Sequence, residues 1–159
     1  MTIRDVQQTS YNNSLARFRR GYTALFALMD DLPEELRERS GACGEWSPKQ
    51  ILAHLSGWIV EASQRYRDFE AGDPTRRTYD WDTDYAIFNA QSVTEREHLS
   101  WDDTLTDLRK AVHSFSLHAE QVTPEQADAD ARYEEWLIAL WNDCVEHMGQ
   151  LCRFIAETP

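Results

Sequence analysis

Residues 47–55 read SPKQILAHL, and this stretch combines a helix start with the first apolar positions of the helix that follows. Ser47 suits the capping position, Pro48 the first helical position and Gln50 the third, which together make a capping box with a preorganised proline. Apolar residues then recur at three- and four-residue steps as far as Phe69. The sequence therefore predicts a long amphipathic helix that closes at residues 72–74.

Three other long segments show the same helical spacing of apolar residues: about residues 10–31, 100–122 and 133–156. Pro33 ends the first of them, because the residue before a proline avoids helical geometry. Ser100 and Asp103, three residues later, form another capping box at the start of the segment over residues 100–122. We expect an all-α four-helix bundle in which the four apolar faces meet on one core.

Two connections, after the second and after the third long segment, carry further signals. Residues 73–82 read as a loop, and a shorter helix is expected over about residues 83–97. Thr123 and Pro124 interrupt the third long helix, and residues 125–132 form a polar connection to the last one. The predicted fold is thus a four-helix bundle with an extra short helix between the second and third long helices.

Composition places the chain among globular proteins. With 159 residues, 42% hydrophobic and 28% charged, residues 1–159 are expected to form a single helical domain. No apolar run approaches the ~18 residues of a membrane span, and no signal-peptide core is seen. Three cysteines without a Cys-x-x-Cys pair argue against a disulfide framework, so we expect a cytoplasmic protein.

The net charge of -12 bears on the partners. So acidic a chain is repelled by nucleic-acid phosphates and by anionic membrane surfaces, and we therefore expect neither as a partner. The six tryptophans are more than a small core easily hides. We expect an aromatic-rich helix face to form a two-fold interface, and hence a homodimer.

Two histidines and one aspartate are the candidates for chemistry. Asp143 and His147 lie four residues apart on the last predicted helix, so both side chains can reach one ion. His54 lies beside the apolar stripe of the second long helix and can complete a triad of two imidazoles and one carboxylate. Spacing alone also allows a simpler interpretation, in which Asp143 and His147 form a local ion pair and His54 is a core-edge histidine.

Two motifs resemble the DinB/YfiT-like family of metal-dependent enzymes. Residues 44–55, GEWSPKQILAHL, resemble the entry to that family's second helix, where a tryptophan, a capping serine or threonine and a proline precede the first metal histidine. Residues 146–151, EHMGQL, resemble the segment that carries its last metal histidine. Residues 88–91 and 99–102 are also similar to the ClbS/DfsB-like branch of colibactin-resistance proteins.

The resemblance covers nearly the whole chain and implies a site. It places the family's three metal histidines on His54, Asp143 and His147, so that an aspartate stands at the middle position. A carboxylate can still ligate Zn, Ni, Fe or Mn, and we expect a divalent transition metal as the cofactor. Met148, where the family has arginine, is a second and milder departure.

The family implies a transferase or hydrolase that acts on a small electrophilic or toxic molecule, in some branches with a low-molecular-weight thiol. The expected pocket wall is Trp58, Trp81, Tyr85 and Asn89, and Glu61 is the candidate general base or reserve ligand. A metal-free small-molecule binding or resistance protein of the same fold is the alternative, and a non-enzymatic interaction module is a third possibility.

Overall fold

The computed structural model describes residues 3–72 and 84–158. Helices account for most of these residues, and they follow one another along the chain as α1 (Ile3–Asp30), the 3-10 turn η1 (Glu34–Leu36), α2 (Pro48–Glu70), α3 (Asp84–Arg96), α4 (Trp101–Glu120), α5 (Pro124–Ala129) and α6 (Arg132–Glu157). The predicted all-α bundle, with a short helix between its second and third long helices, is confirmed.

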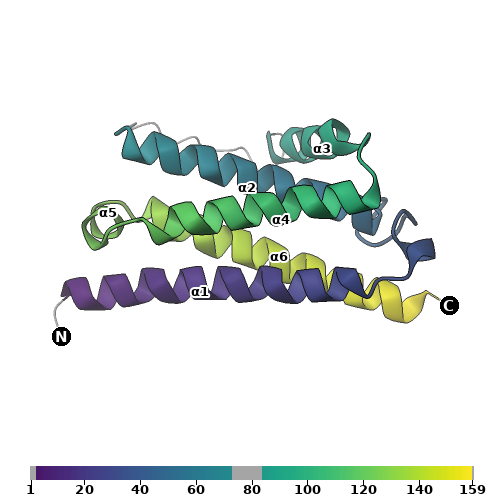
Figure 1. Ribbon diagram of the computed structural model, residues 1–159, viewed down its shortest axis with the longest axis horizontal. Helices are drawn as coiled ribbons and strands as arrows, with labels where there is room; N and C mark the ends of the chain where they lie inside the picture. The colour runs from purple at the N-terminus through teal and green to yellow at the C-terminus, as the bar shows by residue number, and fades with distance from the viewer. Residues whose placement is uncertain (1–2, 73–83, 159) are drawn as a thin grey trace.

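The four long helices lie along the longest axis of the molecule (Figure 1). α1 and α6 run in one direction, and α2 and α4 run in the other (Figure 1). The most extensive helix contacts are between α2 and α4 and between α1 and α6, while α3 packs on α2. None of the described helices is both long and apolar enough to cross a membrane.

Two boundaries differ from the prediction. α1 begins at Ile3, several residues before the expected start near residue 10. The connection expected to be polar and irregular over residues 125–132 contains the short helix α5. Pro124 does interrupt the preceding segment, but it also occupies the first turn of α5, where Thr123 and Gln126 form a second capping box like that of α2.

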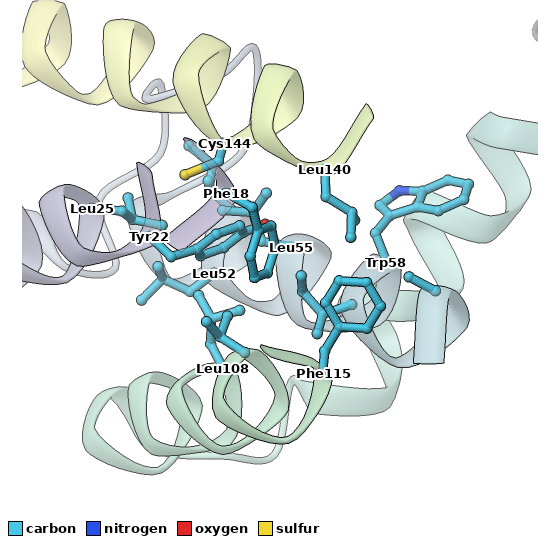
Figure 2. Close-up of a cluster of buried hydrophobic side chains, with 14 of the residues drawn as sticks. Phe18, Tyr22, Leu25, Leu52, Leu55, Trp58, Leu108, Phe115, Leu140 and Cys144 are labelled. Carbon is cyan, nitrogen blue, oxygen red and sulfur yellow. The ribbon is translucent and has the colours of Figure 1, made fainter. Parts of the chain in front are cut away.

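The core forms where the apolar stripes of the four long helices meet. Figure 2 shows Phe18 and Tyr22 from α1, Leu55 from α2 and Phe115 from α4 directed toward one another. All four are fully buried, and the Phe18 and Phe115 rings meet edge to face with centroids 5.3 Å apart. Edge-to-face contacts of this kind stabilise an aromatic core beyond the area that they bury.

The buried stripe of α6 repeats every seven residues and consists of Tyr133, Leu137, Leu140, Cys144, His147, Leu151 and Phe154. Cys152 comes one residue after Leu151, and its apolar neighbours in the sequence favour a buried position, but it is exposed. The reason is that one residue along a helix rotates the side chain by about 100°, which takes Cys152 away from the core. His147, by contrast, occupies a core-facing position of the repeat.

The capping box of α2 provides a first prediction. The Ser47 hydroxyl accepts from the Gln50 N–H, and the Gln50 side chain accepts from the Ser47 N–H at 2.9 Å. Ser47→Ala is expected to lower the free energy of unfolding by about 0.5–2 kcal/mol in urea titrations. Ser63→Ala is the control, because its hydroxyl donates to the Ile59 carbonyl within the helix and has no other partner among the described contacts. Equal effects of the two substitutions would contradict the prediction.

Candidate metal centre and adjoining cavity

Three side chains from two helices converge near the end of the bundle where α2 begins. His54 Nε2 lies 3.2 Å from Asp143 Oδ2, and His147 Nε2 lies 3.4 Å from Asp143 Oδ1. The two imidazole rings are 5.0 Å apart between centroids. One ligand atom from each of the three residues lies within 4.8 Å of the other two. The expected convergence is therefore present.

Helix register and helix capping place these groups. His147 belongs to the seven-residue stripe of α6, and Asp143 lies one turn before it on the same flank. His54 is in the second turn of α2, so the capping box that starts α2 also sets its position. Both histidines are buried, and Asp143 is about one-third exposed at 32%. The carboxylate thus reaches solvent while the imidazoles do not.

His147 is held in one orientation by Gln150. Its Nδ1 lies 2.7 Å from Gln150 Oε1, so Nδ1 carries the proton and donates to the amide oxygen. The Nε2 lone pair is then directed at the centre of the triad, which is the usual arrangement of a metal-binding histidine. Burial lowers the pKa of His147, although Asp143 opposes this shift. The imidazole is therefore neutral near pH 7, as metal ligation requires.

His54 packs against an aromatic ring. The centroids of the Trp46 and His54 rings are 5.1 Å apart, with the planes tilted by 45°. The His54 Nδ1 atom is buried and has no hydrogen-bond partner among the described residues. Nε2, which lies 3.2 Å from Asp143 Oδ2, is the nitrogen that faces the triad.

The donor set fits a divalent transition metal. Ligands bound at ~2.0–2.2 Å lie roughly 2.8–3.6 Å from their neighbours in tetrahedral or octahedral geometry. The two nitrogen-to-carboxylate distances, 3.2 Å to Asp143 Oδ2 and 3.4 Å to Asp143 Oδ1, fall in that interval, although they run to different oxygens, and the set of three ligand atoms lies within 4.8 Å. Two imidazoles and one carboxylate also suit Zn, Ni, Fe or Mn and leave coordination positions open. Without a metal, the His54–Asp143 contact is an ordinary hydrogen bond, whereas His147 Nε2 can donate to Asp143 only when the imidazole carries a second proton.

A cavity of about 720 Å³ adjoins the triad, a size typical of small-molecule sites. Three of the four expected wall residues line it, namely Trp58, Tyr85 and Asn89. Trp58 Nε1 donates to Asn89 Oδ1 at 2.8 Å, which ties α2 to α3 at the cavity wall. The fourth, Trp81, lies outside the described residues. Figure 2 shows Trp58 at the edge of the core, beyond Leu140.

Glu61, the expected general base, is engaged elsewhere. Its carboxylate accepts from Arg65 Nε at 2.7 Å, within the same helix. Arg65 also bonds to Asp68 at 3.0 Å, so the three side chains form one ion-pair group. Glu61 is not among the described residues that line the cavity. The structure therefore does not bring Glu61 to the triad.

The cavity also has walls that sequence spacing did not identify. Trp46, Trp136 and Gln150 line it, together with Glu146. Gln150 could have been found from its position three residues after His147, which places it beside the histidine on the helix. Trp136 could not have been found from the sequence. It lies two turns before Asp143, and its spacing is the same as that of a core residue.

The cysteines near this site have thiols that resist ionisation. Burial, followed by the Glu146 charge, raises the pKa of Cys43, which lines the cavity. Burial raises the pKa of Cys144 to about 12. Because thiolates are the reactive form, a chromogenic disulfide reagent at about pH 8 is expected to modify Cys144 only after unfolding. Cys144→Ala should remove the late-reacting thiol, and rapid labelling of native Cys144 would contradict the prediction.

One family matches the chain over most of its length. The family described as Mycothiol maleylpyruvate isomerase N-terminal domain matches residues 18–151, which include the three triad residues and both sequence motifs. That family is a member of the DinB/YfiT-like superfamily, as the two motifs predicted. No curated protein and no solved structure matches the chain.

Proposed function

Because the chain belongs to the mycothiol maleylpyruvate isomerase N-terminal domain family, we propose that it is a metal-dependent enzyme that joins a low-molecular-weight thiol to a small electrophile. The family is related to mycothiol-dependent enzymes. The observation that carries the proposal is the convergence of His54, Asp143 and His147 beside a cavity of small-molecule size.

The triad, Gln150 and the aromatic wall of the cavity would have separate roles in this reaction. His54, Asp143 and His147 would hold the metal, which supplies positive charge that lowers the pKa of a bound thiol and so favours the thiolate nucleophile at neutral pH. Gln150 orients His147 through the hydrogen bond to Nδ1. The aromatic wall formed by Trp58 and Tyr85 would give the electrophile an apolar surface to bind against. Positioning the two reactants in one cavity removes much of the entropic barrier to their reaction.

Metal analysis of untagged protein is the direct test. About one equivalent of a transition metal per chain, or its uptake on titration, would support the proposal. Less than about a tenth of an equivalent with no uptake would overturn it. A metal-free binding protein is the second candidate, since the Asp143 carboxylate already has a hydrogen-bond partner in His54 without an ion. In that case His54→Ala would leave ligand binding nearly intact.

Gln150 gives a prediction that separates positioning from ligation. Gln150→Ala removes the acceptor for His147 Nδ1, and losing such an outer partner is expected to weaken metal affinity by roughly 10–100-fold. Gln150→Glu keeps an acceptor oxygen and should restore most of the affinity. Gln91→Ala is the control, since that amide bonds only to Glu95 on exposed α3 surface in the described contacts. Titration with a competing chelator measures all three, and an unchanged affinity in Gln150→Ala would contradict the role.

A further inference from the structure

The cavity beside the triad has two chemically different ends. α6 lines one side of it from Trp136 to Gln150. Trp136 and Glu146 are ten residues apart on that helix, which is about 15 Å along its axis. Asp143 lies between them, about 10 Å from the level of Trp136 and about 5 Å from that of Glu146. A substrate that reaches along the cavity therefore meets the triad between its two ends.

The first end is aromatic. The Trp58 ring is 5.0 Å from Tyr85 and 6.2 Å from Trp136 between centroids, and the three rings come from α2, α3 and α6. Phe88 packs behind Trp58 at 4.3 Å. Rings from three helices give this end a rigid apolar wall, which suits a flat or aliphatic group rather than a charged one.

The other end combines an aromatic face with a negative charge. Trp46 and Glu146 both line the cavity there, next to Cys43, whose pKa the Glu146 charge helps to raise. Glu146 is exposed, and no lysine or arginine of the described residues forms an ion pair with it. No lysine or arginine occurs among the described residues that line the cavity. When no metal is bound, the carboxylates of Asp143 and Glu146 are therefore the charged side chains that the described lining presents to a ligand.

Elsewhere the chain covers aromatic faces with its own arginines. Arg17 lies over Trp141 and Arg37 over Trp101, at 5.5 and 5.3 Å from the ring centroids. Arg109 and Arg132 cover two phenylalanines in the same way. Among the described residues, no such cation is placed over the Trp46 ring. The Trp46 ring packs against His54 with centroids 5.1 Å apart, and it also lines the cavity together with Glu146. An aromatic ring and a carboxylate are the groups by which proteins bind organic cations.

We propose that the substrate of this site carries a positively charged nitrogen, which binds between Trp46 and Glu146, and an apolar body that binds against Trp58, Tyr85 and Trp136. The proposal rests on the proposed function only for the statement that the ligand is a substrate. The cavity's preference for a cation follows from the walls alone. Dicarboxylates and other small anions are the class that these walls disfavour.

Three probes that share a phenyl group and differ in charge test the preference. They are the cation 2-phenylethylammonium, the neutral 2-phenylethanol and the anion 3-phenylpropanoate. They are titrated into chelator-treated protein, so that none can bind through a metal, with tryptophan fluorescence and calorimetry as readouts. The ammonium is expected to bind roughly 5–30-fold more tightly than the alcohol, as a cation held by a ring and a carboxylate would. The carboxylate is expected to bind more weakly than the alcohol. Binding of the carboxylate as tight as that of the ammonium would overturn the proposal.

Variants locate the two ends. Glu146→Gln keeps the shape and removes the charge, and it should bring the ammonium close to the affinity of the alcohol without changing the alcohol's own affinity. Glu157→Gln, at the far end of α6, changes the net charge equally and is the control. Trp136→Leu should weaken all three probes alike. An ammonium affinity that is unchanged in Glu146→Gln would overturn the assignment of that end.

The result is independent of the metal test. If the protein takes up no metal but prefers the ammonium, the cation site stands and the proposed enzymatic function fails. If metal binds and the carboxylate is preferred by the chelator-treated protein, the function stands and the cation site is overturned.

Discussion

Replacing His54 with alanine is expected to lower the affinity for a divalent transition metal by at least about 100-fold, because even an outer partner of a ligand accounts for roughly 10–100-fold. His54 is the only one of the three triad residues that α2 contributes. Without His54, only Asp143 and His147 remain as ligands. They lie one turn apart on α6 and would hold an ion from one side only. Competition with a chromogenic chelator, followed by metal analysis, measures the loss.

His118→Ala is the matched control for this substitution. His118 also faces a carboxylate, with Nε2 2.7 Å from Glu70 Oε1, but no third ligand is near it in the described residues. Its loss should leave metal affinity unchanged. A His54→Ala protein that folds, as judged by circular dichroism, and still binds metal as tightly as the unaltered protein would remove His54 from the site. Asp143→Ala should match His54→Ala if the carboxylate is a ligand.

Gly57→Ala is expected to destabilise the protein although alanine is the better helix former. A Cβ at Gly57 would lie 2.2 Å from Ser92 Oγ and 2.5 Å from Ser92 Cβ, so α3 would have to move away from α2. Overpacking of this kind costs about 1–3 kcal/mol, which exceeds the gain of about 1 kcal/mol in helix propensity. Because α3 carries Tyr85 and Asn89, the same shift should open the cavity wall and weaken ligand binding.

Two further variants serve as controls for Gly57→Ala. Gly149→Ala, in α6, meets nothing within 4 Å and should stabilise the protein by up to about 1 kcal/mol. The two glycine substitutions are thus expected to have opposite signs in urea unfolding. In a Ser92→Gly background, the cost of Gly57→Ala should largely disappear, since the obstructing atoms are gone. A cost that stays the same in that background would show that close packing against Ser92 is not the cause.

Local sequence chemistry was sufficient to predict the long helices and their apolar stripes. The capping box at Ser47 and the three- and four-residue apolar spacing predicted α2, α4 and α6 to within a few residues, because both signals act within one turn of helix. The short helix α5 was not predicted, because the sequence prediction treats Pro124 only as the end of the preceding segment. Pro124 breaks the preceding helix and begins the next one, and only the Gln126 side chain, bonded back to Thr123, distinguishes the two roles.

The candidate site was predictable only in part. Asp143 and His147 share a flank because a helix repeats every 3.6 residues, so their pairing follows from spacing alone. The approach of His54 to within hydrogen-bond distance of Asp143 depends on how α2 crosses α6, and 89 residues separate the two in the chain. The resemblance to the family anticipated this approach, and the structure provides its geometry.

Sequence by itself determined the helices, the apolar stripes that drive them together and the types of residue available for chemistry, since propensity, capping and periodicity are properties of neighbouring residues. Tertiary structure decided which of those residues share a site. Glu61 lies on the same helix as His54, yet it bonds to Arg65 and stays outside the cavity lining. Trp46 and Glu146 come from a loop and a distant helix and line one cavity. The reason is that a helix sets positions along its own axis, whereas the crossing of two helices depends on side-chain packing over the whole interface.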